Sequence, residues 1–120
     1  MLQGRVGWRC VADDRLPLIG AAPDESRMPG TAERLFDVPR HDGLYLFTGL
    51  ASRGLSWSVL GGELLAALIC GAPSPLEGSL VDALDPARFA LRAVRKGQWA
   101  SGASGVSVVP GAGPGSAATS

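Results

Sequence analysis

The chain has 120 residues, with 11 acidic and 11 basic side chains, and its formal net charge at pH 7 is zero. This balance excludes binding to nucleic acid or to an anionic membrane by overall electrostatic attraction alone. The sequence has one histidine and two widely separated cysteines, Cys10 and Cys70, so it lacks the ligand cluster of a zinc site and we expect no metal. A disulfide between them stays open as an alternative, but we expect two free, buried thiols.

The first 43 residues predict short extended segments joined by turns and a loop. Residues 5–11 alternate enough to predict a strand, and residues 13–15 predict a turn. Residues 16–20 form a second extended segment. Residues 21–34 are small, polar and punctuated by proline and glycine, which predicts a loop. We expect a further turn over residues 39–43.

The centre of the chain predicts a strand, a glycine-bounded loop and a helix in direct succession. Residues 44–48 are an almost continuous apolar run, typical of a strand in a parallel sheet that helices cover on both faces. The loop spans residues 49–54. From Leu55 onward the apolar residues recur at helical spacing, and Gly71 and Pro73 predict the end of this helix.

The remaining residues predict further helix and then a tail. Residues 76–96 hold one or two helical stretches, with Asp85 as an N-cap before Pro86. Over residues 97–120 the composition shifts to glycine, alanine, serine and proline, which predicts a disordered tail. The chain therefore divides into residues 1–96, a unit of α/β (α+β) class built on the strand-loop-helix core, and the tail of residues 97–120.

Two absences bear on where the protein works. No apolar signal segment follows Met1, and the longest apolar stretch is shorter than the ~20 residues that a membrane span needs. We therefore expect a soluble, cytoplasmic protein with no membrane contact.

The strand-loop-helix segment is the candidate binding site. In open α/β sheets, ligands lie beyond the carboxyl ends of the strands, where the next helix presents free backbone N–H groups. Gly49 and Gly54 would let a flat ligand approach the backbone, and Arg53 adds a positive charge. The pattern alone is compatible with an anionic or electron-rich ligand, and equally with a purely structural turn.

A series of stretches in this sequence carries a family resemblance. Residues 7–11, 13–20 and 43–55, taken in order, resemble the last third of the D-amino-acid-oxidase-like FAD-dependent oxidoreductases. Residues 75–77 and 83–89 extend the likeness to one group of that family, the oxidoreductase halves of bifunctional enzymes that modify the wobble uridine of tRNA. The resemblance implies the C-terminal piece of an FAD-binding Rossmann-like domain.

The resemblance also implies roles for particular residues. Arg9 would grip the substrate carboxylate, for which a planar guanidinium fork is well suited, and Arg53 would lie close to both flavin and substrate. Backbone N–H groups at the helix start would stabilise the negative charge that reduced flavin carries at its pyrimidine edge. The implied cofactor-binding residues are Gly49, Ser52, Arg53, Gly54, Leu55 and Ser56.

The implied reaction is removal of the carboxymethyl group from 5-carboxymethylaminomethyl-(2-thio)uridine in tRNA, with FAD as cofactor and no catalytic acid or base from this chain. The GxGxxG turn that holds the FAD pyrophosphate in the family is absent, so we expect a missing N-terminal FAD-binding portion and an incomplete, inactive chain. Two alternatives stay open. One is a fragment of an enzyme that oxidises a small amino acid such as glycine. The other is a small non-enzymatic module that binds a partner protein through the apolar surface of residues 44–70.

Overall fold

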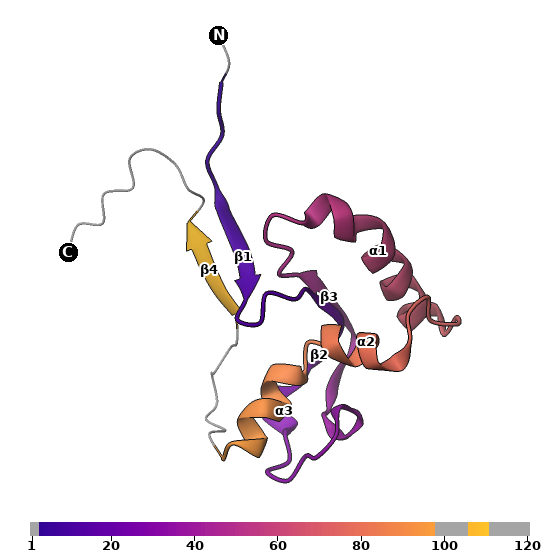
Figure 1. The fold of residues 1–120 in the computed structure, drawn as a ribbon. Coiled ribbons are helices and arrows are strands. Elements are labelled where there is room, and N and C mark those ends of the chain that lie inside the picture. Colours follow the sequence, from indigo (N-terminus) through magenta and orange to yellow (C-terminus); the bar gives the residue numbers. More distant parts are fainter. Residues whose placement is uncertain (1–2, 98–105, 111–120) are drawn as a thin grey trace, which may run out of the picture.

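The computed structural model describes residues 3–97 and 106–110 (Figure 1). The strands are β1 (Trp8–Ala12), β2 (Leu18–Pro23), β3 (Arg40–Thr48) and β4 (Val106–Pro110), and the helices are α1 (Gly54–Cys70), α2 (Gly78–Leu84) and α3 (Arg88–Arg95). Two short 3₁₀ helices, Glu25–Arg27 and Leu35–Asp37, lie between β2 and β3. Small antiparallel sheets combined with helices make this an α+β fold, which confirms the predicted class.

β2 and β3 form an antiparallel two-stranded sheet in which Leu18 is paired with Thr48 and Ile19 with Phe47. The strand predicted over residues 44–48 is confirmed, but two expectations about it were wrong. The strand already begins at Arg40, where we predicted a turn. Its neighbour is the antiparallel β2, whereas we expected the strand to belong to a parallel sheet. An apolar run does not report the direction of the neighbouring strand, and it did not report burial here, since no residue of β3 is buried and Leu44 is 49% exposed.

β1 and β4 form a second antiparallel pair, with Arg9 opposite Val109. Figure 1 shows this pair beside the loop that leads into α1. Residues 106–110 belong to the predicted disordered tail, and the structure places them in a strand, in line with the high strand propensity of their three valines. Residues 98–105 and 111–120 of that predicted tail lie outside the described residues.

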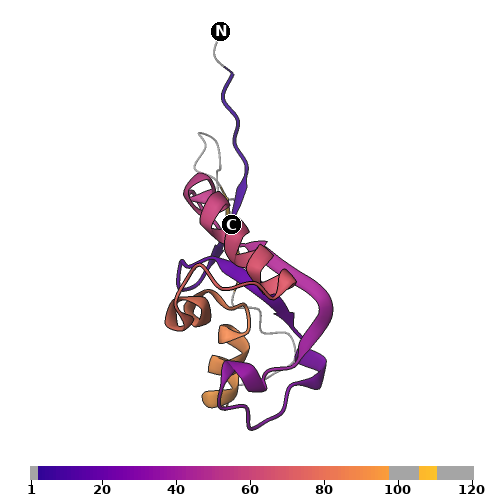
Figure 2. The same cartoon turned by 90° about the vertical axis from the view of Figure 1, so that its right-hand side faces the viewer.

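α1 covers one face of the β2–β3 sheet, as Figure 2 shows from the side. The contact is close because Gly61 faces the sheet: a Cβ there would lie 2.7 Å from two ring carbons of Phe47. Beneath it, Ile19, Leu64 and Leu84 form the buried centre of the larger core cluster. The left-handed Gly71 (φ 67°) ends the helix, as predicted. No helix in the described residues is long and apolar enough to cross a membrane.

The region after α1 forms two helices, so the prediction of one or two over residues 76–96 is confirmed as two. We predicted that Asp85 is the N-cap of the second helix, and this was wrong. α3 begins at Arg88, and Ala87 is its N-cap. The Asp85 carboxylate instead accepts a hydrogen bond from the Ala87 N–H (2.8 Å) and forms a two-point ion pair with Arg40 at 2.7 and 2.8 Å. It thereby ties the α2–α3 connection to the start of β3.

Candidate functional site

β1 and the glycine loop, which are far apart in the sequence, meet in the structure. The carbonyl oxygen of Cys10 accepts a hydrogen bond from the Ala51 N–H at 3.1 Å, and Val11 forms an isolated antiparallel bridge with Leu50. Arg9 directly precedes Cys10, and Arg53 follows Ala51 by two residues. Both predicted substrate-binding arginines therefore lie on segments that are held together at this point.

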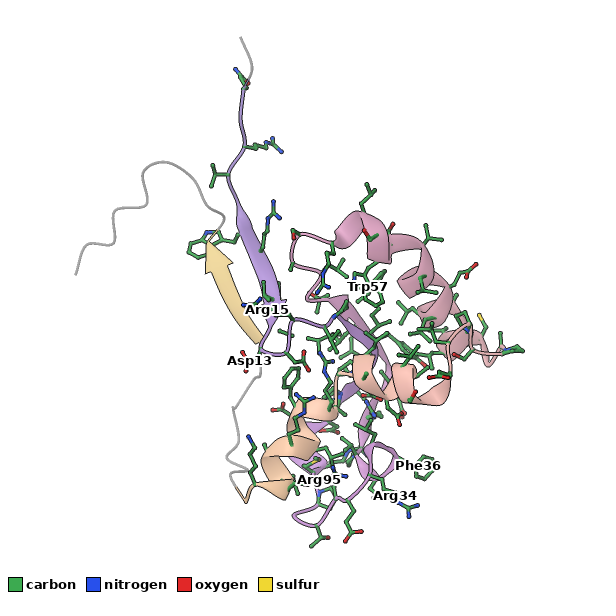
Figure 3. The ribbon with its side chains drawn as sticks, in the orientation of Figure 1. Asp13, Arg15, Arg34, Phe36, Trp57 and Arg95 are labelled. Carbon is green, nitrogen blue, oxygen red and sulfur yellow. The ribbon has the colours of Figure 1, made fainter. Side chains whose placement is uncertain are left out.

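The two arginines are exposed, and each is anchored differently. Arg9 lies on β1, opposite Val109 of β4. Arg53 is the N-cap residue of α1, and its Nη2 donates a hydrogen bond to the carbonyl oxygen of Arg15. Figure 3 shows Asp13 and Arg15 where β1 ends and the chain turns toward β2. Both guanidinium groups are exposed, so an incoming anion could reach either of them.

The start of α1, directly after Arg53, offers backbone donors. No side chain caps this N-terminus, and the first helical hydrogen bond runs from the Trp57 N–H to the Arg53 carbonyl at 3.0 Å. The N–H groups of Gly54, Leu55 and Ser56 precede that bond and have no acceptor in the described part of the chain. Free N–H groups at the start of a 17-residue helix attract negative charge. The start of α1 is therefore able to bind an anionic or electron-rich group of a ligand.

The remaining predicted cofactor residues lie in the loop between β3 and α1. Gly49 is buried in a left-handed conformation (φ 72°), and a Cβ there would lie 3.6 Å from the backbone nitrogen of Leu18. Gly49 therefore shapes the turn and packs on β2. Ser52 is exposed at the tip of the loop. The neighbouring Ala51 is also left-handed (φ 51°), which is unfavourable for a residue with a Cβ.

Replacing Ala51 with glycine should therefore raise the free energy of unfolding by about 1 kcal/mol, because glycine adopts the left-handed conformation without steric cost. The same replacement at Ala66, an exposed position inside α1, should lower it by about 1 kcal/mol through helix propensity. Urea denaturation of both variants measures the two effects. If both variants lose stability equally, the left-handed conformation of Ala51 is refuted.

A cavity of about 230 Å³ elsewhere in the molecule is too small to enclose a flavin cofactor. It lies around the Arg40–Asp85 ion pair and Tyr45, and neither Arg9 nor Arg53 lines it. Sites that enclose drug-sized ligands are commonly about 300–1,000 Å³, and FAD is larger than most such ligands. Arg40 is also fully engaged, since its guanidinium donates to Asp85 and to the carbonyls of Ala21 and Leu35. Among the described residues, no group of His, Cys, Asp or Glu is placed to hold a metal ion.

The structure also shows a supporting ion pair that the sequence reasoning missed. Arg88 of α3 is 4% exposed and donates two hydrogen bonds to the Asp14 carboxylate, at 2.8 and 2.9 Å. Mainly through these bonds, Arg88 lowers the pKa of Asp14 from 3.8 to about 2. Asp14 belongs to the turn whose Arg15 carbonyl accepts from Arg53, so the pair fixes the turn against the rest of the fold. The sequence contained one indirect signal for this pair, which is that Asp14 and Arg88 lie in two separate stretches that carry the family resemblance.

Comparison with known proteins gives the family context. No protein-family model matches the chain. A bifunctional protein from Methylibium petroleiphilum, tRNA 5-methylaminomethyl-2-thiouridine biosynthesis bifunctional protein MnmC, is 60% identical over 95 residues, which cover 74% of this chain and 14% of that protein. Proteins of the same name from Burkholderia thailandensis and Burkholderia mallei are 55% identical over 104 residues, 82% of this chain and 16% of theirs.

The chain thus spans only 14–16% of the length of these curated relatives. Identity of 55–60% across 74–82% of the chain is far above what unrelated sequences share. The chain is therefore homologous to one segment of the bifunctional tRNA 5-methylaminomethyl-2-thiouridine biosynthesis proteins.

Proposed function

We propose that the chain is the substrate-side and flavin-edge part of an FAD-dependent amine oxidoreductase. The proposed reaction removes the carboxymethyl group from 5-carboxymethylaminomethyl-(2-thio)uridine at the wobble position of tRNA. The relatives' names, which state that they take part in 5-methylaminomethyl-2-thiouridine biosynthesis in tRNA, support this substrate class. The observation that carries the proposal is the hydrogen bond between Ala51 and Cys10, because it brings the Arg9 strand to the start of α1.

In this proposal each segment of the chain has a distinct task. Arg9 would hold the carboxylate of the substrate through two parallel hydrogen bonds. The free N–H groups of Gly54, Leu55 and Ser56 would face the flavin's pyrimidine edge and stabilise the charge that develops there. FAD held at this edge would supply two-electron oxidation of the substrate's secondary amine, and water would then release glyoxylate and leave the aminomethyl uridine. The Arg15 carbonyl would keep Arg53 beside this site.

The proposal is tested in a chimera, the Methylibium relative whose matched segment is replaced by the aligned residues of this chain. With tRNA that carries the carboxymethylaminomethyl base, Arg9→Lys should lower kcat/KM roughly tenfold, because lysine lacks the planar guanidinium fork. Arg9→Gln should lower kcat/KM on the order of a hundredfold, because glutamine lacks the positive charge as well. Mass spectrometry of the digested tRNA measures the product base, and flavin absorbance should stay unchanged.

The matched control is Arg5→Gln, an exposed arginine four residues earlier in the same extended segment, which should keep full activity. Equal activity of the Arg5→Gln and Arg9→Gln chimeras would rule out the carboxylate role. If the chimera consumed free glycine and left the tRNA base unchanged, the small-amino-acid alternative would replace the tRNA proposal.

A further inference from the structure

Helix α1 has a second apolar face that points away from the sheet. We name this face the outer seam. Its residues lie alternately four and three positions apart along the helix, and they are Leu55, Val59, Gly62, Ala66 and Ile69. Leu55 is 92% exposed, Val59 72% and Ile69 54%. No member of the outer seam is charged, and Glu63 is the single charged residue of the helix. A helix that is apolar on all sides is normally buried on all sides.

The two adjacent glycines of α1 show that its two faces have different neighbours. Gly61 lies against Phe47 and Ile19 of the sheet, whereas a Cβ at Gly62 would meet nothing within 4 Å. The outer seam thus has bulky residues at its ends and small ones, Gly62 and Ala66, at its centre. The steps of four and three match the spacing by which one helix packs along another, and small central residues allow the two backbones to approach closely.

The relatives point to the occupant of the outer seam. At least 84% of their length lies outside the match, although the matched segment itself is 55–60% identical to this chain. Monomeric proteins rarely leave a continuous apolar stripe of this kind in water. We infer that the outer seam binds a helix from the part of the flavoenzyme that lies outside the matched segment. This inference rests on the proposed function, since it takes the rest of that enzyme as the partner.

The consequence for the site follows from the position of the outer seam. Leu55, its first residue, is also the second residue of α1, whose N–H groups form the candidate flavin edge. A helix packed along the outer seam would therefore fix the direction of α1 and exclude water from one side of the N-terminus.

Cysteine protection tests the inference without relying on activity. Val59→Cys and Ala66→Cys are introduced one at a time after Cys10 and Cys70 have been changed to serine, both in the full chain and in the chimera. Each should react rapidly with a maleimide in the chain alone and roughly a hundredfold more slowly in the chimera, where labelling requires local opening. Asp82→Cys, an exposed position on α2, is the matched control and should react at the same rate in both.

The outcomes separate the inference from the proposed function. Seam cysteines that react in the chimera as fast as in the chain alone overturn the inference. Protection in the chain alone that rises with concentration also overturns it, because the occupant is then a second copy. The same cysteines at the aligned positions of the unaltered relative give the test without a graft. A chimera that stays colourless with FAD but protects the seam cysteines supports the inference and contradicts the proposed function. A chimera that turns yellow with FAD but leaves the seam cysteines reactive contradicts the inference and supports the proposed function.

Discussion

Replacing Gly61 with alanine should lower the free energy of unfolding by about 2 kcal/mol, whereas the same change at Gly62 should raise it by up to about 1 kcal/mol. A Cβ at position 61 would lie 2.7 Å from the Phe47 ring and 3.0 Å from Cδ1 of Ile19. Ile19 is 1% exposed, so it has no free space to move into. Either α1 must move away from the sheet or the Phe47 ring must leave its place beside the core.

The adjacent glycine is the control that isolates packing. Both substitutions gain the same helix propensity, so their difference measures only the contact between α1 and the β2–β3 sheet. Urea denaturation of the full 120-residue chain, followed by the fluorescence of Trp57 in α1, gives both free energies. If both variants were stabilised equally, α1 would not lie on the sheet at Gly61.

The elements that the sequence predicted well are those set by local chemistry. The strand over residues 44–48, the glycine loop and the end of α1 at Gly71 depend on patterns within a few residues. The partner of β3 was not predictable in this way. β2 contains glycine, alanine and proline, which have low strand propensity, and it forms because Ile19 packs under α1. Local patterns also gave no indication of the pairing between β1 and β4.

The residues of the candidate site stay a prediction, and the contacts that support their segments could not be predicted from the sequence. The family resemblance named Arg9 and Arg53, and the contact between Ala51 and Cys10 brings their segments together. The turn that anchors Arg53 is held by Arg88, from a helix that lies far along the chain. An arginine near the start of an amphipathic helix normally lies in solvent, so nothing local marked Arg88 as buried. Long-range pairing of this kind requires the fold.

The Asp14–Arg88 pair should therefore be important for stability, and we expect Asp14→Asn to lower the free energy of unfolding by about 3 kcal/mol. The substitution leaves the guanidinium of Arg88, 4% exposed, without its counter-ion. Asp13→Asn is the matched control, since Asp13 precedes it in the same turn but is exposed, and it should change stability by less than about 0.5 kcal/mol. Equal effects of the two substitutions would contradict the buried pair.

The same pair predicts a pH dependence whose direction follows from the lowered pKa of Asp14. Because this pKa is about 2 in the folded chain and 3.8 for the unperturbed group, the unfolded chain binds the proton first as the pH falls. The contribution of Asp14 is thus fully present above about pH 4 and is lost as the pH falls toward 2. Asp24 behaves similarly, since Ser26 and then Arg27 lower its pKa to about 2, so the wild-type chain alone cannot separate the two carboxylates.

Asp14→Asn separates them, because the variant retains the Asp24 contribution and loses only that of Asp14. Urea midpoints of both chains, measured between about pH 5 and pH 2, should therefore converge as the pH falls, with the difference largest at the upper end. A difference that stayed constant across this range would mean that the Asp14 carboxylate is not linked to folding through its charge. In that case the stability lost in the variant would come from hydrogen-bond geometry, and the turn that anchors Arg53 would be held without an ion pair.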